Sequence, residues 1–209
     1  ALGLDGKQSA VCALGAALSY LYEAQKTDLN NIKEINYYSD AKYMKIGIST
    51  RRNLEITETM RDREKKGSLL WVLDKTKTAM GKRLIRSWLA CPLYDCAAIS
   101  KRHNAVAELC ESTKKRNDFV SLMVDIYDME RLMTRVLYNT ANAKELLSLK
   151  ATLAPLPKIK ELLKDSKSLL LKDIYNDIDV LEDVYTLVSQ AISEDAPFSV
   201  REGGMINDN

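Results

Sequence analysis

Apolar residues recur at steps of three and four along most of this chain, which is the spacing that places them on one face of an α-helix. Residues that interrupt helices are sparse over the same stretch. No glycine lies between Gly81 and Gly203, and proline occurs there only at positions 92, 155, 157 and 197. The pattern therefore predicts long helices. The clearest stripes are Met80, Leu84, Ile85, Trp88 and Leu89; Met129, Leu132, Met133, Val136 and Leu137; and Leu181, Val184, Tyr185, Val188 and Ile192.

Residues suited to helix ends fall where these stripes need them. Asp95 precedes one apolar stripe, and Asn142 is followed three residues later by Glu145. That spacing predicts a capping box, in which each side chain accepts a backbone N–H. The prolines in 155–157 separate two helices, and a further helix is expected near 167–176.

The first 50 residues follow a different pattern. Gln8 to Lys26 is apolar on most helical faces and predicts one buried helix. Residues 33–38 and 43–48 are short and β-prone, with partial alternation. The expected fold class is mainly α, a bundle of long amphipathic helices with a small two-stranded β element near residues 33–48.

The change of pattern also predicts two domains. The boundary lies near residues 28–32, where Asp28-Leu29-Asn30-Asn31 forms a turn. We assign 1–30 as the terminal helix of one domain and 31–209 as a helical domain.

Composition excludes little by itself. The 209 residues are 46% hydrophobic and 29% charged, with a formal net charge of +2. So small a net charge predicts no strong overall attraction to nucleic acid, although a local basic patch remains possible. The four cysteines have no zinc-finger spacing and are expected to be free thiols. A membrane-spanning run of about 18 apolar residues is absent from the sequence.

The sequence offers no complete catalytic pattern. Gly6-Lys7 and Gly81-Lys82 lack the glycine and hydroxyl positions of a phosphate-binding loop. His103 lies on a helical stripe and reads as a residue at the margin of a core. The basic runs at 61–66 and 114–116 lack interleaved aromatics and are expected to be solvated. We expect no catalytic, cofactor-binding or metal-binding residue in this chain.

Several motifs, in order along the chain, resemble the core or lever domain of the MutS family of DNA mismatch-repair proteins. The resemblance spans essentially the whole chain, and residues 7–30 resemble the last helix of that family's connector domain. The motifs are Ile48-Ser-Thr-Arg-Arg-Asn-Leu-Glu-Ile-Thr-Glu-Thr, the run from Gly67 to Trp88 followed by Pro92-Leu, Tyr127-Asp-Met-Glu-Arg-Leu, Asn142-Ala-Lys-Glu-Leu-Leu-Ser-Leu and Val200-Arg-Glu-Gly-Gly-Met-Ile.

The resemblance implies that the chain is a fragment. In the family, the Gly-Gly-x-Ile stretch leads into a clamp domain that holds duplex DNA. The family usually continues with an Asp-Gly-Tyr-Asn-like turn, from which Asn207-Asp208-Asn209 departs. The mismatch reader, the clamp, the returning half of the lever and the ATPase domain are expected outside this segment.

The resemblance also implies a function and partners. This segment would couple the ATP state of the parent protein to its mismatch and clamp domains, without catalysis of its own. ATP and Mg²⁺ would bind the ATPase domain of the parent. The parent would bind duplex DNA containing mismatches, mainly outside this segment, form a homodimer and bind a MutL-type partner. It would be cytoplasmic and nucleoid-associated in a bacterium, with no membrane.

Two groups of residues are candidate junctions in that coupling. Arg51, Arg52, Asn53 and Glu55 are expected to open a helix after the β element. Adjacent arginines point about 100° apart on a helix, so both do not share one solvent face. They could fix the lever against another domain by bidentate bonds, or form an ordinary helix-end salt bridge.

The second candidate group is Asp74, Thr78, Gly81 and Arg83. Gly81 inside a helix costs about 1 kcal/mol relative to Ala, so it is expected to permit close approach of another helix. Glu130 and Arg131 are candidates for a buried ion pair, with an exposed pair as the alternative.

Two other functions remain open, a generic helical protein-interaction module and a helical enzyme with an unrecognised site.

Overall fold

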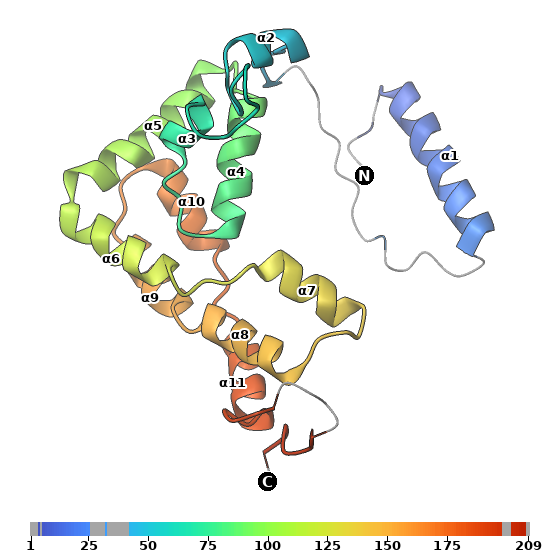
Figure 1. Cartoon of the computed structure of the whole chain (residues 1–209), viewed down its shortest axis with the longest axis vertical. Coiled ribbons are helices and arrows are strands. Elements are labelled where there is room, and N and C mark those ends of the chain that lie inside the picture. Colours follow the sequence, from blue (N-terminus) through green and yellow to red (C-terminus); the bar gives the residue numbers. More distant parts are fainter. Residues whose placement is uncertain (1–3, 5, 26–31, 33–41, 198–201, 208–209) are drawn as a thin grey trace. The chain divides into compact units, whose positions relative to one another are not determined.

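The computed structural model describes residues 4, 6–25, 32, 42–197 and 202–207, and divides into two compact units, Ala1–Lys42 and Tyr43–Asn209. The first unit contains helix α1, Gln8–Gln25 (Figure 1). The predicted helix is therefore confirmed, but its predicted burial is wrong. Val11 and Tyr20 are 49% and 71% exposed. The helix carries its own apolar residues on most of its faces, and the described part of this unit holds no second element to cover them. Of the predicted domain boundary near 28–32, residues 28–31 lie outside the described part of the chain.

The second unit begins with three short helices, α2 (Ile48–Asn53), α3 (Leu69–Leu73) and α4 (Ala79–Ala90). We call residues 48–90 the α2–α4 group. Main-chain hydrogen bonds join the loop after α2 to α3. They run from Leu69 N–H to the Glu55 carbonyl (3.0 Å) and from Leu70 N–H to the Ile56 carbonyl (2.9 Å). Ile56 and Leu70 are buried and form the interior of this group.

The predicted two-stranded element is not supported. Residues 33–41 lie outside the described part of the chain. Within the described part, Tyr43 forms only an isolated antiparallel bridge with Leu93, and Met44 N–H donates to the Pro92 carbonyl at 2.8 Å. Helix α2 then begins at Ile48. The segment that begins at Tyr43, in which apolar and polar residues alternate only in part, is therefore hydrogen-bonded to the loop after α4.

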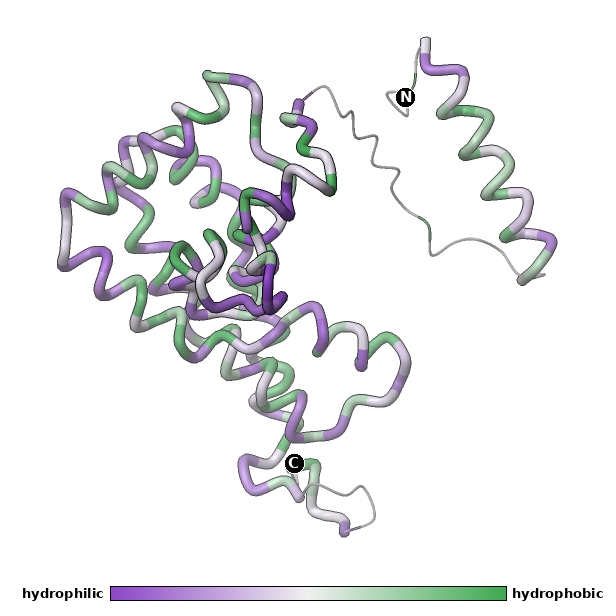
Figure 2. Tube along the Cα trace, turned by 45° about the horizontal axis from the view of Figure 1, so that its top comes forward, coloured by the Kyte–Doolittle hydropathy of each residue, from purple (hydrophilic) through white to green (hydrophobic). Residues whose placement is uncertain are grey.

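Four helices share the main core of the second unit. They are α5 (Cys96–Glu111), α6 (Thr113–Met123), α9 (Leu156–Leu163) and α10 (Leu169–Asp177). Ala105, Ile159, Leu163 and Leu171 are buried at its centre, with Phe119 and Leu122 of α6 packed against them. In Figure 2 hydrophobic and hydrophilic positions alternate along these helices, as their predicted amphipathic pattern requires.

A second cluster joins α7 (Met129–Leu137), α8 (Ala143–Leu153) and α11 (Glu182–Ala191). Its buried apolar side chains are Ala143, Leu149 and Leu153 of α8 and Val188 of α11. Thr152 is also buried, and its hydroxyl accepts from Tyr127 N–H (3.1 Å) while it donates to the Ser148 carbonyl (2.8 Å). The buried hydroxyl is thus satisfied on both sides.

Several local predictions are confirmed. The chain is mainly α-helical, Asp95 caps α5, and Asn142 with Glu145 forms a complete capping box at α8. The four cysteines, all within the described residues, are free. None of the helices in the described part of the chain is long and apolar enough to span a membrane.

After α11 the chain turns back onto the end of that helix. Ser193 N–H donates to the Met205 carbonyl (2.9 Å), and Asn207 N–H donates to the Ala191 carbonyl (3.0 Å). The Asn207 side-chain amide adds a hydrogen bond to the Gln190 carbonyl at 2.8 Å. Residues 205–207 are therefore fixed to the carboxyl end of α11 by both main chain and side chain.

Candidate functional site

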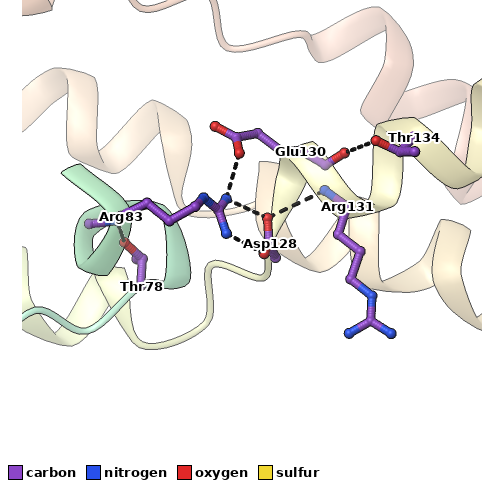
Figure 3. A network of polar contacts seen from close by, with 7 residues as sticks. Thr78, Arg83, Asp128, Glu130, Arg131 and Thr134 are labelled. Atoms are coloured by element: carbon purple, nitrogen blue, oxygen red, sulfur yellow. Dashed lines mark hydrogen bonds and ion pairs between the residues drawn. The ribbon is translucent and has the colours of Figure 1, made fainter. Parts of the chain in front are cut away.

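Arg83 of α4 and Asp128 form a bidentate ion pair across 45 residues of sequence (Figure 3). Both guanidinium nitrogens lie 2.8 Å from the two carboxylate oxygens, and Nη2 also lies 2.7 Å from Oε2 of Glu130. Asp128 is at the same time the N-cap of α7, where it accepts the Arg131 N–H at 3.3 Å. One carboxylate therefore starts α7 and ties it to α4.

We call the contacts of Arg83 with Asp128 and Glu130 the Arg83 fork. The fork shifts the pKa of both Asp128 and Arg83. The hydrogen bond from Arg83 lowers the pKa of Asp128 from 3.8 to about 2, and burial opposes this shift only in part. The same contact with Asp128 raises the pKa of the Arg83 guanidinium. Planar bidentate pairing is specific to arginine, because a lysine ammonium cannot present two parallel N–H groups to one carboxylate.

Glu130 and Arg131 do not form the buried pair that their sequence suggested. Glu130 is 72% exposed and pairs with Arg83 instead of Arg131. Arg131 contributes its backbone N–H to Asp128, while its side chain points away from the network in Figure 3. At the first turn of a helix, Glu130 faces outward, so the pair that forms there is exposed to solvent.

Asp74, Thr78 and Gly81 organise the turn between α3 and α4. Asp74 pairs with Lys65 and accepts the Thr76 hydroxyl at 2.6 Å. These hydrogen bonds, first from Lys65 and then from Thr76, lower the pKa of Asp74 to about 2. Thr78 caps α4 by accepting the Gly81 N–H at 3.0 Å.

The atoms nearest to the Cβ position of Gly81 belong to Thr76 and Thr78 of its own turn, where another helix was expected. A Cβ at Gly81 would lie 3.0 Å from Thr78 Oγ1 and 3.2 Å from Thr76 Cβ. Gly81 is the third residue of α4, which begins at Ala79. The glycine therefore lets the 74–78 turn fold over the start of α4.

Arg51, Arg52 and Asn53 end helix α2 instead of opening a helix, and Glu55 lies beyond it with a positive φ of 48°. Local spacing alone did not show that α2 begins as early as Ile48. Arg51 donates to the Ala90 carbonyl at 3.0 Å and so connects the ends of α2 and α4. Arg52 is exposed, and within the described part of the chain its side chain has no hydrogen bond or ion pair.

A second long-range tie, not expected from the sequence, is made by Glu108. Its carboxylate accepts N–H from Lys167 (2.9 Å) and Ser168 (2.6 Å), so a side chain of α5 caps the start of α10. Lys115 lies 3.8 Å from the carboxylate and donates to buried Ser166 at 3.0 Å. Burial by itself raises the pKa of Glu108, but the bonds from Ser168 and Lys167 outweigh it and leave the pKa lowered.

Comparison with known proteins assigns the chain to a family. Residues 49–208 match the family described as MutS domain III. The DNA mismatch repair protein MutS of Lachnoclostridium phytofermentans is 44% identical over 207 residues, which cover 99% of this chain and 22% of that protein. The corresponding protein of Clostridium novyi is 47% identical over 191 residues, covering 91% and 21%. The chain thus spans about a fifth of the length of these curated relatives. We conclude that it belongs to the MutS family of DNA mismatch-repair proteins and that residues 49–208 form its domain III.

Proposed function

We propose that this chain is a non-catalytic coupling segment of a DNA mismatch-repair ATPase. In this role it transmits displacement between the ATP-binding part of the full-length protein and the parts that hold mismatched DNA. The observation that carries the proposal is the fork from Arg83 to Asp128 and Glu130, which joins the α2–α4 group to the first turn of α7.

Rigid transmission requires ties between elements that are distant in sequence. The Arg83 fork spans 45 residues, and the Glu108 cap spans 60. Close packing around Leu163, which is fully buried, supports movement of the α5, α6, α9 and α10 helices as one body. Displacement of one end is then carried to the other instead of being absorbed by local deformation.

The proposal places ATP and Mg²⁺ outside this chain. The Gly81 N–H, which a phosphate-binding loop would direct at a phosphate, donates to Thr78. Among the described residues, no group of three His, Cys, Asp or Glu side chains could hold a metal ion. We further propose that the full-length protein works in the bacterial cytoplasm as a homodimer and binds a MutL-type partner.

The test uses Asp128→Asn in the full-length protein that contains this chain. Asparagine still caps a helix, but it removes the charge that holds Arg83. We expect normal affinity for mismatched duplex without ATP and slower ATP-induced release from it. Lys172→Gln, an exposed change on α10, is the control and is expected to behave as the unaltered protein.

Arg52→Ala tests the other junction in the same assay. Arg52 is exposed and unpaired within the described part of the chain, so it is available to a neighbouring domain of the full-length protein. We expect weaker coupling between ATP binding and DNA release. If both Asp128→Asn and Arg52→Ala leave ATP-induced release unchanged, this chain is not the coupling segment.

A further inference from the structure

The charge of this chain is unevenly distributed. The α2–α4 group, residues 48–90, contains eleven Lys and Arg against five Asp and Glu, a net charge of +6. The whole chain carries only +2, so the remaining residues sum to −4. A cationic segment inside an otherwise acidic chain is the kind of asymmetry that favours an anionic partner.

The positive charges concentrate around the start of α4. Lys75, Lys77, Lys82 and Arg86, which we call the cationic face, are all exposed. Lys82 and Arg86 are one turn apart on the same side of α4. Thr76 lies 3.2 Å from the Cβ position of Gly81, so Lys75 and Lys77, on either side of Thr76, are held beside the first turn of α4.

The carboxylates that approach α4 itself are already paired. Residues 75–90 contain no Asp or Glu. Asp74 pairs with Lys65 and Thr76, while the two carboxylates that approach from α7, Asp128 and Glu130, pair with Arg83. Within the described part of the chain, the four side chains of the cationic face make no ion pair or hydrogen bond.

Two neighbouring features extend the surface. The ion pair between Lys65 and Asp74 holds the 61–66 loop beside Lys75. That loop adds three exposed cations, Arg61, Arg63 and Lys66, against two exposed carboxylates, Asp62 and Glu64. Trp71 is 46% exposed, with the Lys75 ammonium 5.8 Å from its ring centroid. An aromatic ring beside several unpaired cations is common on nucleic-acid-binding surfaces.

We propose that the cationic face binds the phosphate backbone of nucleic acid without reading its sequence. Long side chains that have no internal partner can each neutralise a phosphate and release its counterion. The family works on DNA, which makes duplex DNA the expected ligand over an acidic protein. Domain III would thereby hold DNA by a contact of its own, separate from the coupling proposed above.

The test is a titration of the full 209-residue chain with labelled duplex DNA that contains no mismatch, followed by fluorescence anisotropy between about 50 and 200 mM salt. Each phosphate contact contributes about 0.9 to the slope of log K against log salt. Changing Lys75, Lys77, Lys82 and Arg86 together to Gln is expected to lower that slope by about 3 to 4 and to weaken binding at least tenfold. Circular dichroism checks that the variant is folded.

The matched control changes Lys114, Lys144, Lys158 and Lys172 to Gln, which removes the same charge from exposed positions on α6, α8, α9 and α10. It is expected to change the slope by less than one. Equal weakening by both variants would show attraction to overall charge and overturn the proposal. Absence of binding to duplex DNA near 50 mM salt would also overturn it, as would competition by polyglutamate equal to that of unlabelled DNA, since the face would then fit an acidic protein.

Discussion

At Asp128 a single carboxylate accepts the Arg131 N–H that starts α7 and holds both guanidinium nitrogens of Arg83. These donors favour its charged form, so the pKa of Asp128 is about 2, below the ordinary 3.8. A carboxyl group whose pKa is lowered in the folded state stabilises the fold at pH values above its ordinary pKa. That contribution is lost as pH falls from about 4 towards 2.

We therefore expect the Asp128 carboxyl to titrate near pH 2 in carbon NMR of the native chain. Arg83→Gln should move its midpoint up towards 3.8. Asp74 serves as the internal control, because its pKa of about 2 depends on Lys65 and Thr76 and should not move. A low Asp128 midpoint that survives in Arg83→Gln would mean that the helix start, and not Arg83, sets it.

Gly81 gives a second prediction at the scale of one residue. Helix propensity alone favours Ala by about 1 kcal/mol. The added Cβ, however, would lie 3.0 Å from the Thr78 hydroxyl, which must stay in place to cap α4. We expect Gly81→Ala to lower the free energy of unfolding by about 1 kcal/mol in urea denaturation, the size of a lost cap.

Gly15→Ala is the matched comparison for that change. Gly15 lies within α1 and has nothing within 4 Å of its Cβ position. The substitution should raise helix content by circular dichroism, because propensity acts there without crowding. A stabilised Gly81→Ala variant would show that the 74–78 turn adjusts at little cost.

At the scale of elements, interactions within a few residues could be predicted and those across the chain could not. The capping box of Asn142 and Glu145 could be predicted from four consecutive residues, and it is present. Arg83 was identified as a candidate, but Asp128, its partner 45 residues away, was not. Glu108 carried no local signal at all, since its role depends on how α5 packs beside α10.

A contrast between the first and second units shows the same limit. Apolar periodicity located α1 correctly, yet burial depends on what covers a helix and not on its own residues. The β-prone 43–48 segment shows the same limit. Its weak alternation of apolar and polar residues did not determine its partner, and it pairs with the backbone of Pro92 and Leu93.

Glu108 provides the prediction at this scale. Glu108→Ala removes the acceptor for the Lys167 and Ser168 N–H groups and should cost about 1 to 2 kcal/mol, as loss of a helix cap does. Amide hydrogen exchange should speed up first at these two residues. Glu111→Ala, exposed on the same helix, should leave both the stability and the exchange near their original values.

At the scale of the whole molecule, the two compact units suggest independent folding of the second. The family match begins at residue 49, inside the second unit. We expect a chain of residues 43–209 to unfold cooperatively with the same urea midpoint as the full chain, losing only the circular dichroism signal of α1. A lower midpoint would show that residues 1–42 stabilise the remainder.

The order of helices around Leu163 has a consequence for biosynthesis. Helices α5 and α6 precede their core partners α9 and α10, with α7 and α8 between them. A ribosome that has just completed Met123 must translate about 50 more codons before Leu171 exists, roughly 2 to 10 seconds at bacterial speeds. Until α9 and α10 have been synthesised, Phe119 and Leu122 lack Ile159, Leu163 and Leu171, the buried side chains against which they pack in the folded chain.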